Sequence, residues 1–262
     1  MLSQLRRAIY RFVKHPLARD VNVDDPLMMD IRRQIIDEKP FLKKIHEDWY
    51  AAIASELRQG EDTILELGSG IGFMKNVIPN LISSDIVPCA DLDILLDGCE
   101  LPFKDNSLNS IVMTNVFHHL PNPRRFFTES ARCISIGGII VMIEPWVTPW
   151  SRFINKLHYE PFRPNDLQWE FLNTGPISGS NNALAWIVFE RDRSQFEREF
   201  PCWKIHKIKL MMPFRYILSG GIYFRNLFPP FTYKIIRAIE ENLDIFIDKI
   251  AMFAQITLIK KP

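Results

Sequence analysis

Apolar residues first follow a helical spacing along this chain and then change to short, strand-like runs. The helical spacing predicts a terminal helix over residues 2–13 and a stronger helix over 41–59, which Gly60 would end. From Thr63 onward the predicted strands are 63–67, 81–85, 92–97, 110–115 and 137–145, with a helix over 123–134. Strands that alternate with helices indicate parallel β-α-β units in a sheet covered on both faces.

This alternation lapses over residues 146–199 and then returns. The later part of the chain is expected to hold a strand over 203–211, a helix over 231–250 and a last strand over 253–261. We therefore predict a doubly wound, mostly parallel, Rossmann-like α/β core. The predicted boundaries are a core of 61–145 and 200–262, an N-terminal helical extension of 1–60, and a lid on the acceptor side of 146–199.

Composition narrows the function classes. The chain has 262 residues, of which 47% are hydrophobic, so it can bury a full core and is not broadly disordered. Its net charge of +1 gives no overall field to attract nucleic acid. The cysteines form no C-x-x-C pair and suit a reduced, intracellular protein; they are Cys89, Cys99, Cys133 and Cys202.

Two observations bear on targeting and membranes. The first residues lack the continuous apolar run of a secretory signal, because basic residues are interleaved with the apolar ones. The uncharged stretch from Phe171 to Phe189 contains several Asn, Ser and Thr residues, whose amides and hydroxyls are costly in hydrocarbon. We expect a cytoplasmic protein that is soluble or, at most, peripheral to the membrane.

Two segments of the chain are basic, and each has two interpretations. Five basic residues and no acidic one precede Asp20, so the terminal helix either packs on the domain or binds anionic lipid at an interface. From Phe200 to Ile239 there are seven Lys or Arg residues, nine aromatics and no acid. That segment is either a surface for an amphiphile with an anionic head or a core with a solvated basic face. Similarly, residues 176–193 suit a polar acceptor or form an ordinary loop.

A glycine-rich turn follows the strand at 63–67, with the sequence ELGSGIG over residues 66–72. It does not fit a dinucleotide fingerprint, because Phe73 stands where the third glycine would be needed, and no G-K-S/T phosphate loop is present. Glu66 would also repel a pyrophosphate. The turn therefore either admits a ligand without phosphates that bears an ammonium group, or is only a tight strand–helix connection.

Polar residues end four of the predicted strands. Asp85 follows Gly68 by seventeen residues, where a carboxylate can accept hydrogen bonds from two ribose hydroxyls. Asp97 is a candidate acceptor for an exocyclic amine, and Asn115 ends the next strand. Because ligands of doubly wound sheets bind at the carboxyl ends of the strands, these residues and Glu66 predict a polar rim around a ligand.

The run from Thr63 to Pro145 resembles the class I S-adenosylmethionine-dependent methyltransferases, especially the branch of ubiquinone and menaquinone biosynthesis. The matching segments are ILELGSGIG, Asp85, DGCELPFKDNSL, IVMTNVFHHLPNP and GGIIVMIEP. The resemblance implies S-adenosyl-L-methionine as cofactor and S-adenosyl-L-homocysteine as product.

The same resemblance implies a role for each matching residue. Glu66, Gly68, Ser69, Gly70 and Gly72 would surround the methionyl part of the cofactor. Asp85, favoured over Asp91, would hold the ribose, Asp97 with Gly98 and Cys99 would meet adenine, and Asn115 would lie near the sulfonium.

Candidate general bases are His118, His119 and Glu144, although the His-His-Leu-Pro turn could instead shape the pocket. No residue spacing indicates a metal site. We therefore predict in-line methyl transfer to a small-molecule or lipid-linked acceptor, with peripheral membrane contact as an added expectation and no nucleic acid partner. The alternatives are a cofactor-binding but catalytically silent partner subunit and a membrane-surface interaction protein on the same fold.

Overall fold

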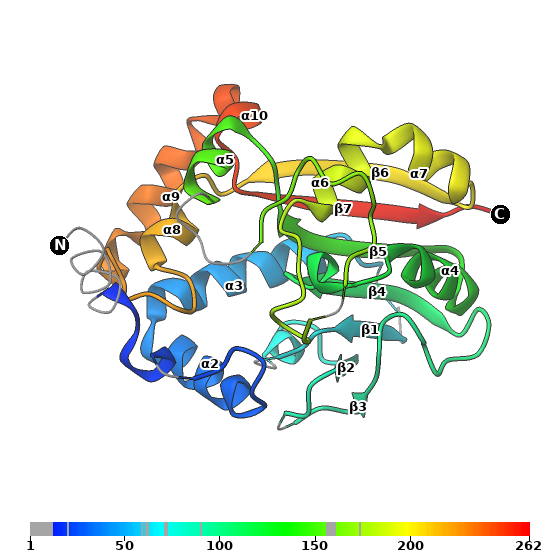
Figure 1. Ribbon diagram of the computed structural model, residues 1–262, viewed down its shortest axis with the longest axis horizontal. Helices are drawn as coiled ribbons and strands as arrows, with labels where there is room; N and C mark the ends of the chain where they lie inside the picture. The colour runs from blue at the N-terminus through cyan, green and yellow to red at the C-terminus, as the bar shows by residue number, and fades with distance from the viewer. Residues whose placement is uncertain are drawn as a thin grey trace.

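A central β-sheet organises the computed structural model, which describes residues 13–19, 21–58, 60, 63–70, 73–89, 91–155, 161–172 and 174–262. Within these residues, seven strands lie in the order β3-β2-β1-β4-β5-β7-β6 (Figure 1). The strands are β1 Ile64–Leu67, β2 Leu81–Asp85, β3 Ile94–Leu95, β4 Leu108–Thr114, β5 Ile134–Pro145, β6 Trp203–Met211 and β7 Phe253–Lys260. Strands β1 to β5 pair in parallel, whereas β7 runs antiparallel to both β5 and β6. This confirms the predicted Rossmann-like α/β fold.

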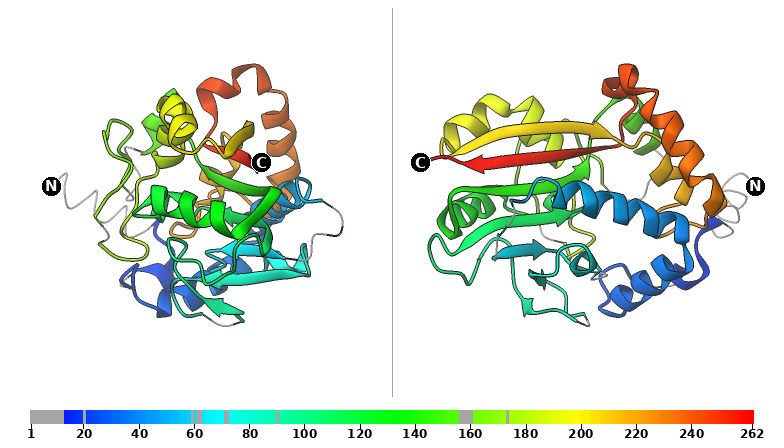
Figure 2. Two further views of the ribbon diagram at one scale, coloured as in Figure 1. Left: turned by 90° about the vertical axis from the view of Figure 1, so that its right-hand side faces the viewer. Right: turned by 180° about the vertical axis from the view of Figure 1, so that it is seen from behind.

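Helices cover both faces of the sheet (Figure 2). They are α2 Leu27–Glu38, α3 Pro40–Ala54, α4 Pro123–Cys133, α5 Pro149–Asn155, α6 Leu184–Trp186, α7 Arg193–Glu199, α8 Arg215–Ser219, α9 Tyr233–Glu241 and α10 Ile247–Ile250. The 3₁₀ helices are η1 Pro16–Ala18, η2 Met74–Asn76, η3 Phe117–His119, η5 Pro230–Thr232 and η6 Asp244–Phe246, and η4 Ile187–Arg191 is a π-helix.

Two apolar clusters, one on each face, hold the layers together. Along β4, Ile111 and Met113 pack in the cluster that contains Phe126 and Phe127 of α4, whereas Val112 packs in the cluster that contains α3. This alternation follows from the strand geometry, in which successive side chains point to opposite faces. Because both faces are covered, the central strands are apolar nearly throughout, as in other parallel sheets.

Local sequence explains where α4 begins and α3 ends. The side chain of Asn122 accepts a hydrogen bond from the backbone N–H of Arg125 at 2.9 Å, and Pro123 occupies the first helical position. Helix α3 ends at Ala54, before the predicted end at 59, and the Ser55 hydroxyl donates to the Ala52 carbonyl at 2.7 Å. A side chain thus satisfies a carbonyl of its last turn.

One other predicted helix is interrupted in the structure, and another lies almost wholly outside the described residues. The single helix predicted over 231–250 is wrong, because the chain forms α9, η6 and α10 instead. The Asn242 amide donates to the Ala238 carbonyl at 2.7 Å, which satisfies the end of α9 and lets the chain turn there. The terminal helix predicted over 2–13 lies outside the described residues except for Val13.

The segment predicted as a lid, 146–199, contributes α5, α6, η4 and α7. Phe189 and Phe196 lie in the same buried cluster as α4, so this segment also helps to cover one face of the sheet. Similarly, α3 of the predicted N-terminal extension packs on the other face. In the described part of the chain, no helix is both long enough and apolar enough to span a bilayer.

Candidate functional site

The turn after β1 is held in place by backbone and hydroxyl contacts to β2. The Ser69 N–H donates to the Ser84 carbonyl at 2.8 Å, and the Gly70 N–H donates to Asp85 Oδ2 at 2.9 Å. Gly68 has φ of 66°, and a Cβ added there would lie 2.3 Å from Val116 Cγ2. Only glycine therefore lets this turn approach the end of β4. Gly72, the last glycine of the turn, lies outside the described residues.

Glu66 lies beneath this turn and is not among the residues that line the adjacent cavity. It is 2% exposed, and its Oε2 accepts a hydrogen bond from the Ser69 hydroxyl at 2.7 Å. Burial raises the pKa of its carboxyl group to about 7, and the nearby charge of Asp85 acts in the same direction.

Asp85 ends β2 and faces the cavity. Its Oδ2 accepts from Gly70 N–H and its Oδ1 accepts from Val87 N–H at 2.9 Å. Burial raises the pKa of this carboxyl group, and these backbone hydrogen bonds partly oppose the shift. Asp91, the alternative ribose ligand, is exposed, does not line the cavity and forms an ion pair with Arg33 at 2.9 Å.

The ends of the next strands supply three more cavity residues, Asp97, Gly98 and Asn115. Asp97 Oδ1 accepts from the Cys99 N–H at 2.8 Å, which fixes this carboxylate at the entrance to the following turn. Asn115 adopts φ of 56°, a left-handed conformation that asparagine tolerates better than most residues. Cys99 itself is buried, does not line the cavity and contacts the Asn122 carbonyl through Sγ at 3.5 Å.

The three predicted base candidates lie close together. His118 and His119 line the cavity, whereas Glu144 contacts His118 and the backbone of its turn. Glu144 is fully buried at the end of β5, and its Oε1 accepts the N–H groups of Val116 and Phe117 at 2.8 Å each. Its Oε2 lies 2.6 Å from His118 Nδ1. His118 and His119 both line the cavity, with their ring centroids 4.2 Å apart. Glu144 therefore orients the His118 ring and the turn that carries it.

A cavity of about 540 Å³ connects these residues to an apolar wall. Its polar end is formed by Gly68, Ser69, Gly70, Asp85, Asp97, Gly98 and Asn115. Its other end is formed largely by apolar side chains of 216–227 and the N-terminal helices, including Val13, Met29, Ile217, Ile222, Phe224 and Leu227. Ligand pockets commonly combine a mostly apolar lining with a few convergent polar groups.

Sequence reasoning did not identify several residues of this cavity. Arg32 of α2 donates to the Tyr223 hydroxyl at 2.6 Å, across 191 positions of the sequence, and both residues line the cavity. His46 and Tyr50 of α3 do so as well. These residues stand in helical patterns without a motif, so only the packing of α2 and α3 against the later segment reveals them. In the described residues, no group of three His, Cys, Asp or Glu side chains could hold a metal ion.

Comparison with known families assigns the central part of the chain. A family described as methyltransferase domain matches residues 65–142, which include the glycine turn and the acids Glu66, Asp85 and Asp97 but not Glu144. The chain contains a methyltransferase domain. This confirms the resemblance to class I S-adenosylmethionine-dependent methyltransferases, while the ubiquinone and menaquinone branch stays a prediction.

Curated relatives of the methyltransferase domain are similar over a limited length. Uncharacterized methyltransferases of Mycobacterium sp. strains KMS and JLS are each 27% identical to this chain over 156 residues. The alignment covers 52% of this chain. This chain spans about 60% of the length of those relatives.

Solved structures are similar at lower identity. The YcgJ protein of Bacillus subtilis is 15% identical, with a TM-score of 0.49 over 83% of this chain and 100% of that protein. Geranyl diphosphate C-methyltransferase of Streptomyces coelicolor, solved with Mg²⁺, geranyl diphosphate and S-adenosyl-L-homocysteine, is 15% identical, with a TM-score of 0.47 over 87% of this chain and 83% of that one.

Proposed function

We propose that this protein transfers a methyl group from S-adenosylmethionine to an amphipathic acceptor, such as a lipid-linked molecule. The observation that carries the proposal is a cavity of about 540 Å³ whose lining includes both the polar strand ends and an apolar wall. The methyltransferase domain supports the choice of cofactor. The apolar wall supports an acceptor with a hydrophobic body.

The polar end of the cavity fits this cofactor. Each Asp85 oxygen accepts one backbone N–H and retains capacity for a further hydrogen bond, as two ribose hydroxyls would require. The backbone at Gly68 and Gly70 would hold the methionyl part, Asp97 would meet the adenine amine, and Asn115 would lie near the sulfonium. When bound, S-adenosylmethionine supplies an activated methyl group on a cationic sulfur, which the carboxylates of Asp85 and Asp97 favour electrostatically.

The other end of the cavity would hold the acceptor. Ile217, Ile222, Phe224 and Leu227 provide an apolar surface on which a hydrocarbon or prenyl-like body could be buried. Such burial would align the reactive atom of the acceptor with the methyl carbon, and alignment can contribute much of the rate acceleration.

His118 would act as the general base where the acceptor is a hydroxyl or a carbon acid. Because Glu144 Oε2 accepts from His118 Nδ1, the neutral ring is held in the tautomer whose Nε2 is a hydrogen-bond acceptor. The acceptor atom would gain the methyl group and lose its proton to Nε2. The variant H118Q should lower the turnover number by about 10²- to 10⁴-fold. Unchanged turnover in H118Q would assign this residue to shaping the turn.

Calorimetric titration with S-adenosylmethionine and S-adenosylhomocysteine tests the cofactor site. We expect both to bind, and D85N to weaken binding by about 1–3 kcal/mol because a charged hydrogen-bond acceptor is lost. The matched control is D91N, which changes an exposed aspartate that does not line the cavity and should leave affinity unchanged. No binding to the folded wild-type protein would refute the proposal.

A further inference from the structure

An exposed apolar surface follows the cavity segment along η5 and α9. It consists of Leu227, Phe228, Phe231, Ile235 and Ile239, which we call the α9 apolar face. Phe231 is 78% exposed and Ile235 is 61% exposed, and the residues at 231, 235 and 239 recur every four positions. On α9 this spacing places Ile235 and Ile239 on one side, and Phe231 of η5 precedes them, so the three side chains form an apolar stripe.

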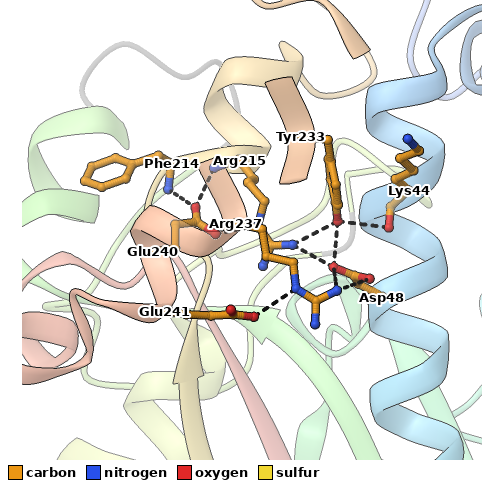
Figure 3. Close-up of polar contacts among 8 residues, drawn as sticks. All are labelled: Lys44, Asp48, Phe214, Arg215, Tyr233, Arg237, Glu240 and Glu241. Atoms are coloured by element: carbon orange, nitrogen blue, oxygen red, sulfur yellow. Dashed lines mark hydrogen bonds and ion pairs between the residues drawn. The ribbon is translucent and has the colours of Figure 1, made fainter. Parts of the chain in front are cut away.

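The opposite side of α9 is packed against the protein. Tyr233 and Ile236 lie in the buried cluster that contains α3, and Glu240 is 4% exposed. Glu240 Oε1 accepts the backbone N–H groups of Phe214 and Arg215 at 2.8 and 2.7 Å. Its other oxygen pairs with the Arg215 guanidinium (Figure 3).

Charged contacts to α3 fix the helix further. Asp48 accepts from Arg215 at 2.6 Å and from the Tyr233 hydroxyl at 2.6 Å. Arg237 bridges Asp48 and Glu241 at 3.1 and 2.9 Å (Figure 3). Because these bonds anchor one side of α9, the apolar stripe on the other side is held toward solvent. Monomeric proteins rarely expose such contiguous apolar surface without an interaction that uses it.

Cationic residues gather at the end of this face where η5 begins. Arg225 and Lys234 are exposed, and no acid occurs between residues 200 and 239. The Arg225 N–H donates to the Val13 carbonyl at 2.9 Å, so Val13 lies at this same end. The sequence before Asp20 has five basic residues and no acid. The acids Glu241, Asp244 and Asp248 follow at the other end, beyond the α9 apolar face.

This charge distribution discriminates between occupants of the α9 apolar face. The basic first residues of the chain would meet the like charges of Arg225 and Lys234 if they covered it. An anionic surface, by contrast, would attract both cationic segments while the apolar side chains enter its hydrocarbon. We propose that the α9 apolar face docks the protein on an anionic lipid bilayer.

Docking would also bring the bilayer to the mouth of the cavity. Leu227 both belongs to the α9 apolar face and lines the apolar end of the cavity, and it is 58% exposed. An amphiphile could therefore pass from the bilayer to the acceptor site without crossing water. The docking itself does not depend on methyl transfer, so vesicle binding and cofactor binding can fail separately.

Sedimentation of the full chain with lipid vesicles tests this inference. Vesicles of phosphatidylcholine alone are compared with vesicles that also contain phosphatidylglycerol. We expect preferential binding to the anionic vesicles, and about a tenfold or greater loss of binding in I235D/I239D, because apolar area is replaced by charge. I235S/I239S, which adds no charge, should also bind more weakly and shows whether apolar burial itself matters.

The matched control is I136D. Ile136 is also exposed, but it lies near the start of β5. The β5 residues that follow it pair with the last residues of β7, at the end of that strand farthest from α10. This variant should bind vesicles like the wild type, and circular dichroism should show all variants folded. Equal binding to both vesicle types, no binding, or binding that I235S/I239S leaves unchanged would overturn the proposal. So would a lipid-free dimer that I235S/I239S dissociates, because the face would then be covered by a second copy.

Discussion

Replacement of Glu66 by glutamine should change the pH dependence of stability in a defined direction. The Glu66 carboxyl group is 2% exposed, and its burial raises the pKa from the usual 4.5 to about 7. Between these values the folded protein keeps a proton on Glu66 that the unfolded chain has lost. The unfolded chain thus binds fewer protons, and the wild-type free energy of unfolding falls as pH rises from 4.5 to about 7.

The magnitude follows from the two pKa values. Each pKa unit corresponds to about 1.4 kcal/mol, so the wild type should lose about 2–3 kcal/mol from this group between about pH 5 and pH 8. Glutamine does not titrate and can still accept the Ser69 hydroxyl hydrogen bond through its amide oxygen. The stability of E66Q relative to the wild type should therefore rise by that amount over the same interval.

Urea unfolding of both proteins at the two pH values measures this difference directly. Comparing the two proteins at each pH cancels the other titrating groups, provided that the unfolding slopes agree. A stability difference that stays constant with pH would refute the reasoning, since it would mean that Glu66 is ionised in the folded protein at both values.

Two further predictions concern other residues of the site. Gly68→Ala should destabilise the protein more than Gly60→Ala, because both positions have positive φ but only the Cβ at 68 would clash, at 2.3 Å from Val116 Cγ2. The left-handed conformation alone costs about 1–2 kcal/mol at either position. Thermal or urea unfolding measures the two losses of stability, and equal losses would contradict the close approach. His46→Leu should reduce the loss of stability in acid, because burial lowers the pKa of the His46 imidazole to about 4. Between pH 6.5 and that value, the unfolded chain binds a proton that the folded protein does not. Urea unfolding across this pH range measures the difference, and equally steep acid losses in both proteins would contradict the prediction.

Local patterns predicted much of the sheet, and tertiary contacts determined the rest. The strand predicted over 203–211 is β6, because alternating apolar and basic residues there report a strand with one covered face. The helix predicted over 231–250 failed because its apolar spacing continues beyond Asn242, whose side chain ends α9. Periodicity detects residues on a common face, but it does not detect the point where one helix ends and the chain turns.

The candidate site, too, could be predicted from the sequence only in part. Asp85, Asp97 and Asn115 could be found because parallel strands place their carboxyl ends at one edge of the sheet. The place of α2 at the cavity could not be predicted, because Arg32 and Tyr223 meet only when α2 packs against a segment far along the chain. Similarly, the sequence offered Glu144 as an acceptor-facing base, and only the fold reveals that it binds the backbone of the His118 turn.

Methyl transfer to a membrane-derived acceptor tests the central claim most directly. Purified protein would be incubated with S-adenosylmethionine labelled in its methyl group and with a lipid extract, and label in the organic phase would be counted. We predict label that requires active protein and is strongly reduced in D85N but not in D91N. Cofactor binding without transfer to the lipid extract or to a water-soluble extract would contradict the enzymatic claim and favour a catalytically silent partner subunit.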